Sequence, residues 1–128
     1  MDINDAIEIA KKARLNACAS TYYVGACLVT KSGKCFSGCN IENNGIQSIC
    51  AERVSFVKAL SEGEHEFEFI VVVGAPKDST TLDNCLPCGY CRQFMSQYVD
   101  SNFKIYCYYD GKVDEYTISD LLPHAFEL

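Results

Sequence analysis

The stretch Phe67–Val73, with the sequence FEFIVVV, decides the fold class of this chain. It is a nearly continuous apolar run, which is typical of a strand buried on both faces of a sheet. A helical segment follows from Pro87, a residue suited to the first turn of a helix, to about Val99. Phe103–Tyr109 is then a second strand. A strand, a helix and a strand in this order predict a right-handed, parallel crossover within one sheet.

The chain before this unit predicts a helix, a β-hairpin and a second helix. Strands at Tyr22–Thr30 and Cys35–Asn40 flank a turn at residues 31–34. The second helix runs from about Ile49 to Leu60, and its apolar side carries Val54, Val57 and Leu60. The first helix is indicated by apolar residues at helical spacing, namely Ile3, Ala6, Ile7, Ala10, Ala13 and Ala17.

The remaining segments complete an alternating pattern. Residues 75–86 form a loop, Asp110-Gly111 is a hairpin-type turn, Val113–Ile118 is an edge strand, and residues 121–123 begin a short tail. The element order α-β-β-α-β-α-β-β predicts an α/β fold, a three-layer α/β/α sandwich around a single mixed five-stranded sheet. A length of 128 residues fits one domain over residues 1–128.

Composition and charge argue against several classes of function. The chain carries 11 Lys and Arg against 17 Asp and Glu, which gives a net charge of −6. A protein that binds nucleic acid needs a basic face to neutralise phosphates, so we expect no nucleic-acid partner. The N-terminus lacks the pattern of a signal peptide, and no apolar stretch is long enough to span a bilayer. We therefore expect a cytoplasmic protein with a small, weakly charged ligand and no membrane partner.

Nine cysteines are the most informative feature of the composition. An odd number without a secretion signal argues against a disulfide framework, which leaves metal ligation, catalysis and core packing as uses for the thiols. Cys18, Cys27 and Cys107 lie among apolar residues and are interpreted as core residues. The other thiols include those with the spacing of metal ligands.

Three cysteines form a candidate zinc site. Cys88 and Cys91 follow Pro87 at positions i and i+3, so they share one face of a helix. Cys50 opens the other relevant helix and is the natural third ligand. Zinc prefers thiolates in a tetrahedron, and three protein ligands leave the fourth position open, as in catalytic sites. We expect one Zn²⁺ per chain.

Glu52 lies two residues after Cys50 and is not expected to bind the metal. Positions i and i+2 of a helix point apart, so Cys50 must lie at or before the first turn if both residues are to reach one ion. Zinc supplies hydroxide near neutral pH, and three thiolates oppose that effect by donating charge. Arg53 and Arg92, each next to one of these residues, can offset the charge by donating to the sulfurs. The arrangement resembles the zinc nucleobase deaminases, in which a non-ligand glutamate is the general acid and base.

Two other interpretations of the cysteines stay open at this point. Cys85, Cys88 and Cys91 have the C-x₂-C-x₂-C spacing that iron–sulfur clusters use. Addition of Cys50 would also give a closed four-cysteine structural zinc site. Either would make the protein an electron carrier or a non-catalytic interaction module, and neither explains Glu52.

Over nearly its whole length the sequence resembles the small homotetrameric cytidine deaminases of the cytidine and deoxycytidylate deaminase superfamily. The motifs that carry the resemblance are, by residue number, 24–26 (VGA), 38–43 (GCNIEN), 50–53 (CAER), 87–93 (PCGYCRQ), 121–123 (LLP) and 125–126 (AF). The resemblance implies hydrolytic deamination of cytidine and deoxycytidine to uridine or deoxyuridine and ammonia, as a step of pyrimidine salvage. Zinc-bound hydroxide would attack C4, with Glu52 as the proton shuttle.

The resemblance also implies the residues that bind substrate. Asn40 and Glu42 would hold the ribose hydroxyls, Tyr22 would line the base pocket, and Ala51 would lie against the base. Phe126 of one subunit would cover the active site of a neighbour in a homotetramer.

The sequence departs from the family pattern at two places. Tyr22 stands where many relatives have Phe, and residues 44–49 are one residue short and lack an aromatic side chain. Blasticidin-type deaminases share the zinc motif and are the alternative within the superfamily. Glu42 favours an ordinary nucleoside, because a carboxylate suits a free ribose hydroxyl.

Overall fold

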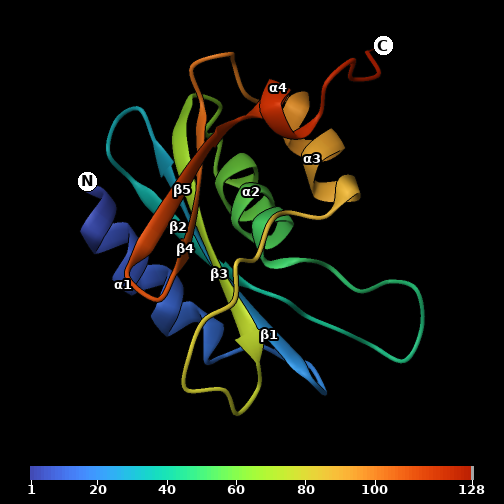
Figure 1. Cartoon of the computed structure of the whole chain (residues 1–128). Coiled ribbons are helices and arrows are strands. Elements are labelled where there is room, and N and C mark those ends of the chain that lie inside the picture. The colour runs from blue at the N-terminus through green and yellow to red at the C-terminus, as the bar shows by residue number, and fades with distance from the viewer. Residues whose placement is uncertain (128) are drawn as a thin grey trace.

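The structure, a computed structural model, describes residues 1–127, which form four helices and five strands (Figure 1). The helices are α1 (Ile3–Arg14), α2 (Ala51–Ser61), α3 (Gly89–Ser96) and α4 (Ile118–Leu121). The strands are β1 (Tyr22–Thr30), β2 (Cys35–Cys39), β3 (Phe67–Pro76), β4 (Lys104–Tyr109) and β5 (Lys112–Thr117).

All five strands belong to one sheet in the order β2-β1-β3-β4-β5. β3 and β4 are parallel, whereas the β1–β2, β1–β3 and β4–β5 pairs are antiparallel. The mixed five-stranded sheet predicted from the sequence is therefore confirmed, with the FEFIVVV run in its central strand and β5 at an edge.

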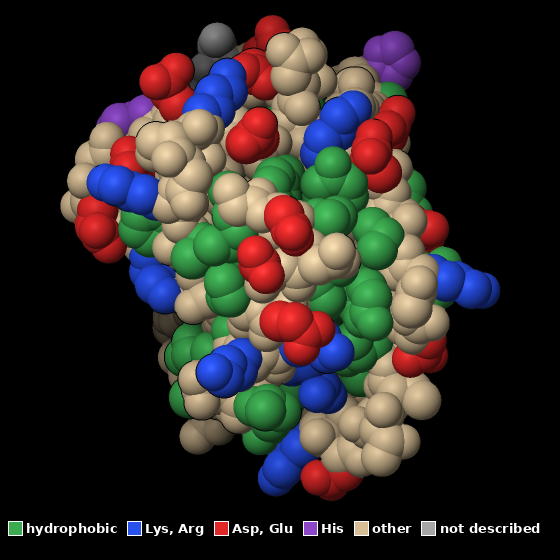
Figure 2. Space-filling model, turned by 90° about the vertical axis from the view of Figure 1, so that its left-hand side faces the viewer, with side chains coloured by type: hydrophobic (Ala, Val, Ile, Leu, Met, Phe, Trp, Pro, Cys, Tyr) green, Lys and Arg blue, Asp and Glu red, His purple; other side chains and the backbone are tan. Residues whose placement is uncertain are grey.

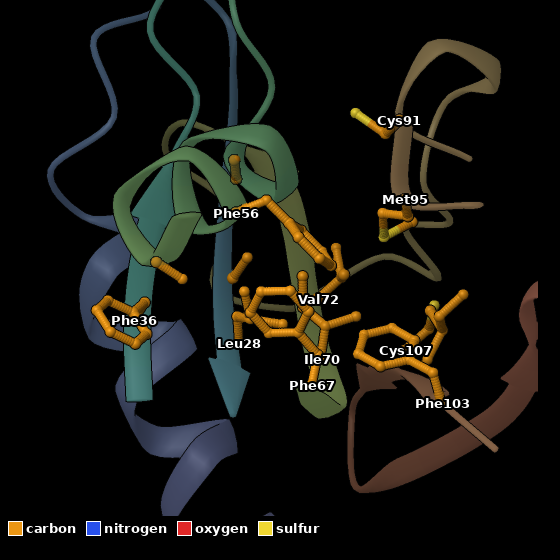
Figure 3. Packing of buried hydrophobic residues seen from close by; sticks show 14 of the residues in the cluster. Leu28, Phe36, Phe56, Phe67, Ile70, Val72, Cys91, Met95, Phe103 and Cys107 are labelled. Carbon is orange, nitrogen blue, oxygen red and sulfur yellow. The ribbon is translucent and has the colours of Figure 1, made fainter. Parts of the chain in front are cut away.

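Helices cover both faces of the sheet and make three layers (Figure 1). α1 packs on one face over a cluster that includes Cys27, Val29, Val71 and Val73. The opposite face carries the larger cluster beneath α2 and α3, where Phe56 lies among the rings of Phe67, Phe94 and Phe103. In Figure 3, Cys91 and Met95 extend from α3 toward α2, so the helix that carries a candidate ligand is fixed to this core.

The prediction for the buried face of α2 is wrong. The helix buries Ala51, Glu52, Ser55, Phe56 and Ala59, whereas Val57 is 41% exposed. Small residues allow a close approach to β2. A Cβ atom added at Gly38 would lie 2.5 Å from the carbonyl oxygen of Ala51 and 2.7 Å from the hydroxyl of Ser55. This contact brings the start of α2, and with it Glu52, down onto the sheet.

Several predicted boundaries also differ. β3 continues to Pro76 because the long strand β1 pairs with it as far as Tyr22, so the following loop begins after residue 76. α3 is shorter than the predicted segment and starts after Pro87. α4 was not predicted, although Thr117 and Asp120 form a capping box at its N-terminus.

The cysteines that were interpreted as core residues differ in their burial. Cys27 and Cys107 are buried as predicted, but Cys18 is exposed because it lies beyond the end of α1, in the connection to β1.

Among residues 1–127, no helix has the length and apolarity needed to cross a membrane. Figure 2 shows the side on which α1 lies, where Lys and Arg side chains are interspersed with Asp and Glu instead of gathered in one basic patch.

Candidate active site

Cys50 lies where the sequence argument requires it. It is the N-cap residue of α2, with extended backbone angles (φ −75°, ψ 157°), and Glu52 lies in the first turn of the helix. The break in helical geometry at Cys50 lets the two side chains reach one cavity, which both of them line. Ordinary helical backbone at residue 50 would have turned them apart.

The start of α3 repeats this arrangement. Cys88 is the N-cap residue (φ −68°, ψ 166°), and Cys91 follows in the first turn. The Sγ atoms of Cys50 and Cys88 are 3.7 Å apart, and those of Cys88 and Cys91 are 3.6 Å apart. α2 and α3 therefore bring three sulfurs to one point from segments that are 38 residues apart in the sequence.

The three sulfurs fit a zinc ion. Zinc–sulfur bonds of about 2.3 Å in a tetrahedron place neighbouring sulfurs about 3.8 Å apart, close to the distances in the structure. Cys50, Cys88 and Cys91 are the group whose ligand atoms all lie within 4.8 Å of one another. Cys85 does not belong to this group, because its Sγ packs against Gly74. The iron–sulfur and four-cysteine interpretations therefore lack their additional ligand.

Glu52 is the buried carboxyl group of the site. Its side chain is 3% exposed and lines the same cavity as Cys50 and Cys88. Burial raises the pKa of this carboxyl to about 7, and the negative charge of Cys50 acts in the same direction. A carboxyl group with a pKa near neutrality can both accept and donate a proton, which is the property a general acid and base needs.

Arg53 supplies positive charge to the sulfurs. Its Nη2 atom donates a hydrogen bond to Cys50 Sγ at 3.8 Å, and its guanidinium carbon lies 4.1 Å from the centre of the Tyr90 ring. Hydrogen bonding from the Cys91 thiol, and then from Arg53, lowers the pKa of Cys50 and favours its thiolate. Arg53 thus lies where the sequence analysis placed it.

Arg92 differs from that expectation. Its Nε donates to the carbonyl oxygen of Pro87 at 2.7 Å, and its Nη1 donates to that of Leu121 at 2.9 Å. The unpredicted helix α4 supplies the second acceptor, and it draws the guanidinium to the backbone. Arg92 therefore fixes the turn before Cys88 through backbone contacts, not through a sulfur.

A cavity of about 250 Å³ opens in front of Glu52 and the thiols. It includes the expected substrate-binding residues Tyr22, Asn40 and Glu42. Ser48, Ile49 and Cys85, which the sequence analysis did not assign to the site, also line it, together with Val24 and Leu86. A larger cavity of about 570 Å³ lies between α1 and residues 79–82, but it contains none of the three clustered thiols, so volume alone does not identify the site.

Asn40 and Glu42 differ in how they are held. Asn40 is buried, its Oδ1 accepts from the Val24 backbone at 2.9 Å, and its Nδ2 donates to the Tyr22 carbonyl at 2.9 Å. The same Nδ2 lies 3.4 Å from Glu42 Oε2. Asn40 therefore fixes the start of β1 and orients Glu42, whose exposed carboxylate faces the cavity.

Two expected substrate-binding residues lie outside the cavity of their own chain. Ala51, the first residue of α2, is fully buried, and Phe126 is 67% exposed near the C-terminus. The backbone oxygen of Phe126 accepts a hydrogen bond from Gln93 at 3.0 Å, which anchors the tail to α3. Figure 1 shows this tail leaving the molecule beyond α3 and α4.

Comparisons with known proteins agree with this geometry. A family model for the cytidine and deoxycytidylate deaminase zinc-binding region matches residues 2–107. A cytidine deaminase of Sporosarcina psychrophila is 36% identical over 130 residues, which cover 98% of this chain and 92% of that protein. A blasticidin-S deaminase of Bacillus cereus is 35% identical over 107 residues, covering 80% of this chain and 75% of that protein. The crystal structure of a cytidine deaminase from Burkholderia pseudomallei has a TM-score of 0.87 and 38% identity, and covers 98% of this chain and 100% of that one.

Proposed function

The chain belongs to the zinc-binding family of cytidine and deoxycytidylate deaminases, and from that premise we propose that it hydrolyses cytidine and deoxycytidine to uridine or deoxyuridine and ammonia. The observation that carries the proposal is the buried Glu52 carboxyl, which lines one cavity with two of the three clustered thiols. A structural metal site has no need of a desolvated carboxyl with a pKa near 7.

The residues of the chain divide the reaction between them. Cys50, Cys88 and Cys91 would hold a zinc ion, which as a Lewis acid would make water nucleophilic near neutral pH. Glu52 takes a proton from the attacking water and delivers it to ring N3, while the water oxygen forms the new bond to C4. Glu52 then carries the second proton, from the new C4 hydroxyl, to the exocyclic nitrogen; the C4–N bond breaks as the C4 carbonyl forms, and ammonia leaves. Water and cytidine are thereby converted to uridine and ammonia in balance.

The charge of the cavity supports a free nucleoside over a nucleotide. Among the described residues that line it there is no Lys or Arg, whereas Glu42 and Glu52 both face it. A 5′-phosphate is usually paired with Lys or Arg side chains, and Glu42 would repel it. Glu42 instead offers an acceptor to ribose hydroxyls, with Asn40 behind it.

Blasticidin S is the second candidate substrate, because the Bacillus cereus blasticidin-S deaminase is 35% identical to this chain. Glu42 is the observation that favours an ordinary nucleoside. A direct assay separates the two: loss of ultraviolet absorbance is followed with cytidine, deoxycytidine, deoxycytidine monophosphate and blasticidin S. Cytidine turnover that a strong chelator abolishes and zinc restores is the expected result. Turnover of blasticidin S or the monophosphate in preference to cytidine would contradict the proposal.

We also infer that the chain acts as a homotetramer in the cytoplasm, as part of pyrimidine salvage. Large apolar side chains remain exposed at several places on the chain, including Leu15, Ile46, Tyr90 and Phe126. Burial of such side chains between copies would favour association in a symmetric oligomer. The cysteines of the chain are all free thiols, which suits a reducing compartment.

A further inference from the structure

The phenol of Tyr22 is tied to a residue 61 positions away in the sequence. Its hydroxyl donates a hydrogen bond to Asp83 Oδ2 at 3.1 Å. Tyr22 is the first residue of β1, and Asp83 lies in the loop between β3 and α3. Both ends of the bond matter to the site, because Tyr22 lines the cavity and the loop leads from Asp83 to Cys88.

A glycine in the intervening strand makes this contact possible. Gly74 pairs with Val24 of β1 on one side of β3 and bridges to Asp83 on the other. A Cβ atom at position 74 would lie 3.1 Å from Cε2 of Tyr22 and 2.6 Å from Cys85 Sγ. The Tyr22 ring therefore passes over Gly74 toward the far side of the strand, with the Cys85 side chain packed beside it. A larger residue at position 74 would displace the ring or the thiol.

Asp83, the acceptor of this hydrogen bond, lies in a segment that is held in place by backbone contacts. The Asp83 amide donates to the Gly74 carbonyl at 2.8 Å, and the neighbouring Leu82 amide donates to Asp110 Oδ1 at 3.1 Å. Burial, followed by the nearby Cys85 and Asp83, raises the pKa of the Tyr22 phenol, so its hydroxyl stays protonated as the donor. Neither partner has to be ordered by substrate.

We propose that Asp83 is a positioning residue that fixes the Tyr22 ring as the base-contacting wall of the cavity, with Gly74 as the gap through which the bond forms. This inference rests on the proposed nucleoside deamination. The bond links the wall to the loop that ends at Cys88, so the ring keeps its place relative to the zinc ligands before substrate arrives. An aromatic wall that is already ordered costs less entropy on binding than one that substrate must order.

The test is a double-mutant cycle on the zinc-loaded protein with cytidine as substrate. Asp83→Ala should raise KM roughly threefold to tenfold, the scale of one net hydrogen bond, while kcat changes little. Asp83→Asn keeps an oxygen acceptor and should restore KM to within about twofold of the parent. Tyr22→Phe should raise KM like Asp83→Ala, and the double variant should be no worse than either single variant.

Asp78→Ala is the matched control, because Asp78 is an exposed aspartate of the same loop. It should behave like the parent. Zinc content and the unfolding midpoint are measured for every variant, so that a misfolded protein is recognised. An Asp83→Ala effect that persists undiminished in the Tyr22→Phe background would overturn the proposal, as would unchanged KM in an active enzyme. A parent protein that does not turn over cytidine would instead refute the proposed function.

Discussion

Arg53 lies one helical turn after Cys50, and its Nη2 atom donates to the Cys50 sulfur at 3.8 Å. The guanidinium also lies over the ring of Tyr90, with its central carbon 4.1 Å from the ring centre. Three thiolates would give a zinc ion a net negative charge, which weakens its ability to activate water. We therefore propose that the contact between Arg53 and Cys50 offsets the charge of an all-sulfur ligand set.

Substitution of Arg53 should test that compensation. We expect Arg53→Gln to lower kcat/KM for cytidine roughly 10- to 100-fold, the scale found for groups that support metal ligands. Arg53→Lys keeps a charge but loses the planar contact with Tyr90, so its activity should lie between those of the parent and Arg53→Gln. Steady-state kinetics at fixed zinc loading provide the measurement. Equal activity of Arg53→Gln and the parent would show that the sulfurs need no cation.

Zinc content should distinguish substitutions of the three clustered thiols from a substitution of Cys85. Cys88→Ser and Cys91→Ser should lose most of the zinc, because each removes one of three protein ligands. Cys85→Ser should retain one zinc per chain although Cys85 lines the same cavity, and Cys18→Ser is the control for an exposed thiol. Metal analysis after dialysis gives the stoichiometry, and an X-ray absorption edge gives the ligands. A spectrum with four sulfurs, or loss of zinc from Cys85→Ser, would be incompatible with the site described above.

Glu52 should be needed for turnover but not for metal binding. Glu52→Gln keeps the shape of the side chain and removes its proton-transfer capacity, so kcat should fall by at least ~10²–10⁴-fold while zinc is retained. Glu62→Gln, an exposed carboxylate at the other end of the same helix, is the matched control. Single-turnover assays on zinc-loaded protein make the comparison. Substantial turnover by the Glu52 variant would place the proton shuttle on another residue.

Much of the fold and the metal cluster could be predicted because their signals are local. An apolar run gives the central strand, and the Pro-Cys-x-x-Cys spacing after it places two ligands on the first turn of a helix. The requirement that Cys50 precede the α2 helix followed from helical geometry alone, and the structure satisfies it. These signals depend on residues within a few positions of one another, whereas the meeting of Cys50 with Cys88, 38 positions away, depends on the fold.

The features that were missed depend on distant contacts. Arg92 turned to the backbone because α4, an element of four residues, offers the Leu121 carbonyl 29 positions away. The apolar side of α2 was misassigned because close packing on Gly38 selects small residues, which periodicity does not distinguish. Asp83 carries no motif at all, since its link to Tyr22 spans 61 residues and depends on the gap at Gly74.

Asn40 and Glu42 should give different kinds of defect. Asn40→Ala leaves the Val24 amide without its acceptor and the Tyr22 carbonyl without a donor, so the free energy of unfolding should fall by about 1–3 kcal/mol. Glu42→Ala removes an exposed carboxylate and should leave the free energy of unfolding unchanged. It should raise KM for cytidine and have much less effect on 2′,3′-dideoxycytidine, which lacks both ribose hydroxyls. Denaturant titration and kinetics test the pair, and a similar KM increase with both substrates would argue against a ribose contact for Glu42.

Phe126 is 67% exposed and lies outside the cavity of its own chain. If it covers the site of a neighbouring copy, Phe126→Ala should lower kcat/KM roughly tenfold or more, the scale of burying one aromatic ring, without loss of zinc. A point substitution is preferable to truncation, because Gln93 donates to the Phe126 backbone and truncation would remove that anchor as well. The decisive experiment mixes Phe126→Ala chains with Glu52→Gln chains, refolded together at micromolar concentration. The first chain has an intact site without cover, and the second has intact cover without a proton shuttle. Mixed oligomers should therefore recover activity above the sum of the separate proteins, because each uncovered site can receive Phe126 from a neighbour. Sedimentation of the same samples gives the oligomeric state, and an active monomer, or a mixture no more active than its parts, would exclude a shared site.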